Sequence, residues 1–299
     1  MIKIKLGIIT DIHGNSVALR EIIKDANDNK VDIFFVLGDL VNDLPFGNET
    51  MDMVRNLTDV VLKGNKEQYI IEYDDERYDW DNIQFRNTIF MYNELRRDNI
   101  DYIKTLPHCK YVEYEGVRLA LAHGSLKSVE ELVNEYKDKI IDSYTKDLNA
   151  DALIFGHTHE KSWHKYSNGK LVLNAGCAGV SPHYSGTGEY VILEVNNGKI
   201  LGIEKRLVKY NTEEVKKKIL ESGILSEDNV FMNLTYCAVV GRGDIRESFL
   251  REARDIMLAR KGKWYRDDAK GIFKYFRLYD DDIWLSLAEK YKDNFILTQ

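Results

Sequence analysis

Seven side chains of metal-ligand type stand at the ends of short apolar runs in this sequence. They follow the runs LGIIT, FFVLG, VVLKG, LALA and ALIFG, and they are Asp11, His13, Asp39, Asn65, His123, His157 and His159. Apolar runs of this length are typical of buried strands. Strands of one sheet that end together would bring these side chains to one edge. So many oxygen and nitrogen donors at one edge predict a metal site, and one for two ions.

Carboxylate oxygens and imidazole nitrogens are the ligands of hard and borderline divalent metals. A carboxylate can bridge two ions, and ions about 3.5–4 Å apart can hold the attacking and leaving oxygens of a phosphoryl displacement. Glycines beside the candidate ligands permit sharp exits from the strands, at Gly38, Gly64, Gly124 and Gly156. For Asn15, capping of the following helix is a better interpretation than metal ligation.

The elements that must position these residues alternate between strands and helices in the first part of the chain. We expect strands over 2–10, 32–37 and 59–62, and helices over 15–29 and 49–57. This alternation indicates βαβ units and a parallel sheet. Residues 66–106 break the rhythm and predict a helical insertion, with a helix over 87–98.

Hairpins and one long helix are expected in the middle of the chain. Gly116, Asn168-Gly169 and Asn197-Gly198 are turn signals between strand-like segments. A helix is predicted over 128–148, with Ser128 and Glu131 as a capping box, and a strand over 152–155.

Strand signals fade after about Tyr210. Helical patterns follow over 212–220, 226–240, 244–261 and about 282–291, the third with Asp244 and Glu247 as a capping box. We therefore predict a catalytic domain over residues 1–210 and a helical C-terminal extension over 211–299.

Composition and charge narrow the class of protein. The 299 residues are 44% hydrophobic and 30% charged, as in ordinary globular proteins. A net charge of −7 disfavours a general nucleic-acid binder. No apolar run suits a membrane span, and no signal peptide is evident. The three cysteines, Cys109, Cys177 and Cys237, are an odd and sparse set without C-x-x-C spacing, which fits a reducing compartment, and we expect them to be small buried residues. We expect a cytoplasmic protein.

The five motifs resemble, in order and spacing, the signature blocks of the calcineurin-like metallophosphoesterases. They are Asp11-x-His13, Gly38-Asp39, Gly64-Asn65, His123-Gly124 and Gly156-His157-Thr158-His159. The resemblance covers about residues 1–210. Gly38-Asp39-Leu40-Val41, the helical stretch after Gly64-Asn65 and Asn174-Ala175-Gly176 are most similar to the small bacterial and archaeal phosphodiesterase branch.

That resemblance implies a fold and a ligand set. The fold is an α/β four-layer α-β-β-α sandwich. One metal would have Asp11, His13 and His159, the other Asn65, His123 and His157, and Asp39 would bridge them. The ions would be Mn²⁺, Fe, Ni²⁺ or Zn²⁺, and their identity cannot be deduced from ligands of this mixed type.

Two positions depart from relatives. Lys66 stands where family members often carry a histidine that contacts phosphate. A lysine is a poor proton donor at neutral pH, so Lys66 either acts electrostatically on the phosphate or has no catalytic role. Asp43 stands where the protein Ser/Thr phosphatases of the superfamily place an arginine that binds phosphate. Protein phosphatase activity is therefore disfavoured.

The resulting hypothesis is a dinuclear metal-dependent hydrolase of small phosphate esters or nucleotides, acting by in-line attack of a metal-bound hydroxide. Asp39, Asn65, His123 and Lys66 would carry the catalysis. Phosphodiesters are preferred over monoesters as substrates. The alternatives are a phosphomonoesterase or protein phosphatase, or a metal-binding, non-catalytic scaffold of the same fold. The aromatic residues of the insertion either stack on a nucleotide base or form its packing core; they are Tyr69, Tyr73, Tyr78, Trp80 and Phe85.

Overall fold

The computed structural model describes residues 3–73, 83–131, 133, 145–166, 168–226, 229–240, 245–262 and 280–291. Its strands are β1 (Ile4–Ile9), β2 (Ile33–Val36), β3 (Cys109–Tyr114), β4 (Val117–Ala122), β5 (Ala152–Phe155), β6 (Ser162–Lys165), β7 (Leu171–Asn174), β8 (Thr187–Asn196) and β9 (Lys199–Lys209). They form a four-stranded sheet in the order β2-β1-β8-β9 and a five-stranded sheet in the order β3-β4-β5-β7-β6.

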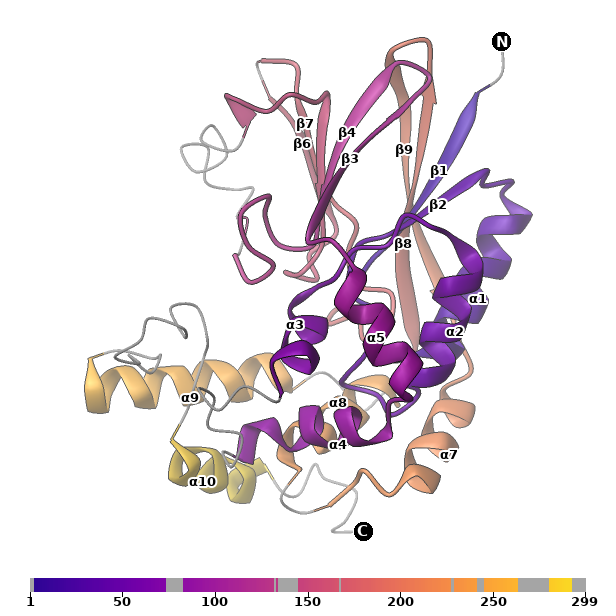
Figure 1. The fold of residues 1–299 in the computed structure, drawn as a ribbon. Coiled ribbons are helices and arrows are strands. Elements are labelled where there is room, and N and C mark those ends of the chain that lie inside the picture. Colours follow the sequence, from indigo (N-terminus) through magenta and orange to yellow (C-terminus); the bar gives the residue numbers. More distant parts are fainter. Residues whose placement is uncertain are drawn as a thin grey trace.

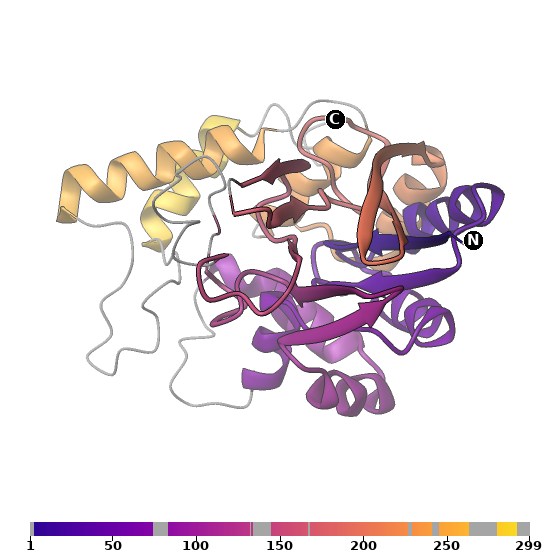
Figure 2. The same ribbon diagram turned by 90° about the horizontal axis from the view of Figure 1, so that it is seen from above.

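Helices cover the outer face of the first sheet and one end of both sheets (Figure 1). They are α1 (Ser16–Asp28), α2 (Gly47–Leu57), α3 (Asn65–Glu72), η1 (Ile83–Phe85), α4 (Arg86–Glu94), α5 (Arg97–Thr105), α7 (Thr212–Ser222), α8 (Val230–Val239), α9 (Arg246–Lys261) and α10 (Asp281–Tyr291). The C-terminal helices pack on one another, α9 against both α8 and α10, and α10 contacts η1 directly before α4 (Figures 1 and 2). Among the described residues, none of the helices combines the length and the apolar character needed to cross a membrane.

Alternating side chains of the strands build the layers. In β1, Leu6 and Ile8 belong to the core between the two sheets, whereas Ile9 packs with the α1 residue Ile22 on the outer face. Side chains such as Leu153 on the far face of the second sheet form another core. The predicted four-layer α-β-β-α sandwich with C-terminal helices is confirmed. Residues 134–144, which belong to the helix predicted over 128–148, lie outside the described residues.

Several predicted elements differ in detail. Residues 59–62 contribute a single parallel bridge, Val36 to Val61, and no strand. The helix predicted over 87–98 is divided into α4 and α5, because Asn48 supplies tertiary partners at the break. Its amide donates to the Glu94 carbonyl (2.8 Å) and its oxygen accepts from the Arg96 N–H (2.9 Å).

Three helix starts also differ. Ser128 caps no helix, because Glu131 binds the Ser125 hydroxyl instead and residues 129–130 form a turn. The remainder of that predicted helix lies largely outside the described residues. Helix α8 begins at Val230, and α9 begins at Arg246. The predicted cap Asp244 lies outside the described residues.

Candidate metal centre

The seven candidate ligands converge at one edge of the two sheets. Parallel pairing of β1 with β2, and of β4 with β5, places the carboxyl ends of these strands together. The loops that follow are tied to one another: the Asp11 N–H donates to the Gly38 carbonyl (3.1 Å), and the Gly156 N–H donates to the His123 carbonyl (2.9 Å). Convergence therefore follows from the topology.

Five of the seven residues have left-handed backbone conformations. The φ angles are 55° at Asp11, 52° at His13, 51° at Asp39, 66° at His157 and 60° at His159. Residues with a Cβ are uncommon in this region, and such strain concentrates at functional sites. Each loop turns sharply directly after its strand.

Two glycines are required by close approach. A Cβ on Gly64 would lie 2.2 Å from Asp39 Oδ1. A Cβ on Gly156 would lie 2.1 Å from Thr10 Oγ1 and 2.5 Å from Asp11 Oδ2. The two carboxylates therefore occupy space that only a residue without a side chain leaves open.

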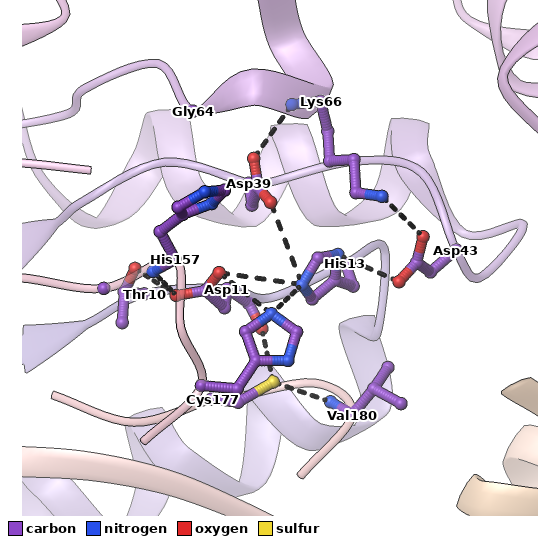
Figure 3. A network of polar contacts seen from close by, with 12 residues as sticks. Thr10, Asp11, His13, Asp39, Asp43, Gly64, Lys66, His157, Cys177 and Val180 are labelled. Atoms are coloured by element: carbon purple, nitrogen blue, oxygen red, sulfur yellow. Dashed lines mark hydrogen bonds and ion pairs between the residues drawn. The ribbon is translucent and has the colours of Figure 1, made fainter. Parts of the chain in front are cut away.

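The first group of ligand atoms surrounds Asp11 (Figure 3). Asp11 Oδ1 lies 3.2 Å from His159 Nε2 and 3.7 Å from His13 Nε2. The two imidazole nitrogens are 3.0 Å apart. Asp11 Oδ2 is held by the Thr10 hydroxyl (2.7 Å) and the His157 N–H (3.0 Å), which leaves Oδ1 directed at the imidazoles.

The second group surrounds His123. Its Nε2 lies 3.1 Å from Asn65 Oδ1 and 3.4 Å from Asp39 Oδ1. Its ring centroid is 5.0 Å from that of His157, and ligand atoms of Asp39, His123 and His157 all lie within 4.8 Å of one another. The Asp39 carboxylate connects the groups, because Oδ2 lies 3.9 Å from His13 Nε2.

Burial and charge suit divalent cations at this place. Asp11 and His123 are fully buried, and within the described part of the chain Asp11 Oδ1 has no hydrogen-bond partner. Burial acts to lower the pKa of His123, but the carboxylates of Asp39 and Asp11 outweigh it and raise that pKa to about 9. Burial and His123 lower the pKa of His157 to about 3, so this imidazole is neutral, the form that binds metals. Divalent ions would replace the protons that the carboxylates hold on imidazole nitrogens.

The loops are fixed by a buried carboxylate that the sequence interpretation missed. Glu67 accepts backbone N–H groups from Asp39 (2.8 Å), Leu40 (2.8 Å), Val41 (3.1 Å) and Gly64 (2.7 Å). It joins the loop that carries Asp39 to the start of α3. Its spacing from Gly64 is that of a capping box, which is the signal that would have identified it.

Cys177 was interpreted only as a small buried residue. The structure brings its Sγ within 4.8 Å of ligand atoms of His13 and His159. The thiol donates to the Asp11 carbonyl (3.3 Å) and accepts from the Val180 N–H (3.3 Å).

The structure also places the other residues that the sequence singled out: Lys66, Asn15 and the aromatic residues of the insertion. The Lys66 ammonium lies 3.3 Å from Asp43 Oδ1. Asn15 caps α1, accepting from the Ala18 N–H (3.0 Å), as predicted. Of the insertion aromatics, Phe85 is buried and Tyr73 stacks on Tyr92 at 4.0 Å. Tyr78 and Trp80 lie outside the described residues.

Comparison with known proteins agrees with this geometry. The model of the calcineurin-like phosphoesterase superfamily domain matches residues 4–198. The uncharacterized protein MJ0912 of Methanocaldococcus jannaschii is 22% identical over 237 residues, which cover 74% of this chain and 94% of that protein.

Two solved structures share the fold. A metallophosphoesterase from Sphaerobacter thermophilus has a TM-score of 0.62 at 20% identity, covering 77% of this chain and 98% of that one. The hypothetical protein PH1004 from Pyrococcus horikoshii OT3 has a TM-score of 0.64 at 14% identity, covering 77% and 97%. The matched residues 4–198 span more than half of the sequence and all seven converging side chains, and the chain belongs to the calcineurin-like phosphoesterase superfamily, a superfamily of metal-dependent phosphoesterases.

Proposed function

We propose that this protein is a dinuclear metal-dependent phosphodiesterase acting on small phosphate esters or nucleotides. One observation carries the proposal: the buried Asp39 carboxylate has one oxygen 3.4 Å from His123 Nε2 and the other 3.9 Å from His13 Nε2. A carboxylate placed between two groups of imidazoles is suited to bridge two ions. Asp11, His13 and His159 would hold one ion, and Asn65, His123 and His157 the other.

The chain's own residues would orient the reaction. Two bound divalent ions, whether Mn²⁺, Fe, Ni²⁺ or Zn²⁺, supply Lewis acidity and a water of lowered pKa. Asn65 and His123 lie together at the second group and would orient a phosphoryl oxygen there. The His123 Nδ1 contacts the Leu37 carbonyl (2.9 Å), which fixes the ring so that Nε2 faces Asp39.

The preference for diesters rests on the resemblance to the phosphodiesterase branch and on position 43. Asp43 stands where the phosphatases place a phosphate-binding arginine, so this position supplies no guanidinium to pair with a dianionic monoester. We expect a higher kcat/KM for bis(p-nitrophenyl) phosphate than for p-nitrophenyl phosphate. The reverse order would favour a phosphomonoesterase.

The test of the proposal is metal-dependent hydrolysis and its loss on substitution of Asp39. Protein loaded with Mn²⁺ should hydrolyse bis(p-nitrophenyl) phosphate, and Asp39→Asn should abolish turnover and weaken binding of both ions. Full activity of Asp39→Asn would show that the ligand assignment is wrong. Metal binding without hydrolysis of any monoester, diester or nucleotide would favour the scaffold alternative.

A further inference from the structure

A buried carboxylate lies behind His13, on the side of the ring away from the other ligands. Asp43 Oδ2 is 3.2 Å from His13 Nδ1, whereas His13 Nε2 faces Asp11 and His159 (Figure 3). Asp43 is only 2% exposed. Among the described residues His13 Nδ1 has no hydrogen-bond partner, so its contact with Asp43 is an ion pair. A histidine that binds a metal through Nε2 keeps a proton on Nδ1, and a carboxylate that accepts this proton fixes the ring and raises the basicity of the ligand. Asp43 is the carboxylate placed to accept it.

Lys66 neutralises this carboxylate. Its Nζ lies 3.3 Å from Asp43 Oδ1, and the lysine side chain is 18% exposed. Burial acts to raise the pKa of Asp43, but Lys66 and His13 keep it below its usual value. The lysine at position 66 therefore faces the group that supports a metal ligand.

The loop that carries Asp43 is strained and braced by residues from other parts of the chain. Asn42 and Asp43 have φ angles of 73° and 59°. The Asn42 amide donates to Thr88 Oγ1 (3.0 Å), and the Asn87 amide donates to Asn42 Oδ1 (3.1 Å) and to the Asp43 carbonyl (3.2 Å). The amide of Asn229, the N-cap of α8, donates to Asn87 Oδ1 (3.4 Å).

The C-terminal helices also contact the lysine side of this pair. Lys66 Nζ lies 5.6 Å from the centroid of the Phe231 ring of α8. Arg246, the first residue of α9, is 7% exposed and donates to the Val180 carbonyl (3.2 Å), and its charge acts on both Asp43 and Lys66. Helices α7 and α8 share an apolar core with Leu44 and Phe46, directly after Asp43. The extension thus packs against the metal centre.

We propose that Asp43 is a positioning residue that orients His13 for metal binding, that Lys66 is its counter-ion, and that the C-terminal helices hold this pair in place. The proposal rests on the dinuclear centre described under Proposed function. It gives Lys66 a role at the metal in place of one at the phosphate, and it gives the C-terminal extension a role in catalysis.

The test is a titration of the metal-free full-length chain with Co²⁺. Calorimetry measures the affinity of each ion, and the visible absorption of bound Co²⁺ reports its ligand geometry. Asp43→Asn should weaken binding at the His13 ion about 10–100-fold and change its spectrum, since loss of such a partner has effects of this size. Lys66→Met should weaken the same ion, with KM for bis(p-nitrophenyl) phosphate unchanged when metal is saturating. The matched control is Asp25→Asn. Asp25 lies on the outer helix α1, and its carboxylate is paired with Arg206 of β9.

A second variant keeps the test independent of the folding of Asp43→Asn. Asn229→Ser retains a good N-cap for α8 but removes the amide that reaches Asn87. It should weaken the His13 ion several-fold, with a smaller spectral change than Asp43→Asn.

Two results would overturn the proposal. Asp43→Asn with wild-type affinity and spectrum would exclude a positioning role. Lys66→Met with unchanged Co²⁺ affinity but weaker inhibition by inorganic phosphate would place Lys66 at the substrate. Wild-type protein that binds two Co²⁺ ions without hydrolysing any ester would instead refute the proposed function and leave the positioning role measurable.

Discussion

Replacing Gly64 by alanine tests the close contact between the backbone of α3 and the Asp39 carboxylate. The backbone of Gly64 has φ −102° and ψ −167°, which alanine adopts without strain, so the effect is steric. The new Cβ would lie 2.2 Å from Asp39 Oδ1 and 2.5 Å from the Asp39 backbone nitrogen. Either the carboxylate or the start of α3 must move.

The size of the movement follows from the contact. Bringing the separation from 2.2 Å to the 3.4 Å of an ordinary contact requires a shift of about 1.2 Å. Metal–ligand distances tolerate about 0.2 Å, and a misplacement of about 1 Å costs on the order of 100-fold in rate. We expect Gly64→Ala to lower Mn²⁺ affinity or kcat/KM about 100-fold.

Calorimetric Mn²⁺ titration and diester hydrolysis are the assays. The control is Gly202→Ala in β9, where the nearest atom to the new Cβ is Glu194 Oε2 at 3.8 Å and neither assay should change. Activity and affinity of Gly64→Ala within twofold of wild type would show that Asp39 need not occupy its observed position, and would refute the bridging role.

Three further substitutions test the supports of the site. Glu67→Gln places an amide N–H₂ against two backbone N–H groups and should destabilise the metal-free protein by about 3 kcal/mol in urea denaturation. A loss of stability under about 1 kcal/mol would show that Glu67 does not hold the two loops together. Asn15→Ala removes the cap of α1 and should cost about 0.5–2 kcal/mol while leaving Mn²⁺ affinity unchanged, because Asn15 is no ligand. Leu121→Ala in the core between the sheets should cost about 2–5 kcal/mol, and a cost under about 1 kcal/mol would mean that the core closes over the cavity.

The convergence of the seven candidate ligands could be predicted because it depends on local signals. Apolar runs ending in Asp11, Asp39 and His123 indicate buried strands, and parallel strands bring their ends to one edge. The strand predicted over 59–62 failed because only Val61 bridges to β2. The apolar pattern of residues 59–62 indicates that the segment is buried. A segment with a single bridge is buried in the same way as a full strand, so the pattern does not distinguish them.

The support of His13 could not be predicted from the sequence. It requires left-handed backbone at Asp43 and contacts with Asn87 and Asn229, which come from distant segments. The sequence interpretation noted Asp43 only as a departure from the phosphatases. For Lys66 the sequence left open an electrostatic role at the phosphate or no catalytic role. Nothing in the local sequence reveals that Asp43 lies 3.3 Å from its ammonium.

The boundary predicted at about Tyr210 marks a change in sequence character, and the residues on its two sides pack together. Beyond it, Val215 and Met232 share a core with Val17 and Phe46. Truncation there would therefore expose apolar surface of the catalytic part, so point substitutions are the better probes of the extension.

Anomalous diffraction from crystals grown with Mn²⁺ tests the central claim most directly. Two peaks about 3.5–4 Å apart are expected, with Asp39 between them, Asp11, His13 and His159 around one, and Asn65, His123 and His157 around the other. A single peak, or peaks that Asp39 does not touch, would contradict the dinuclear centre.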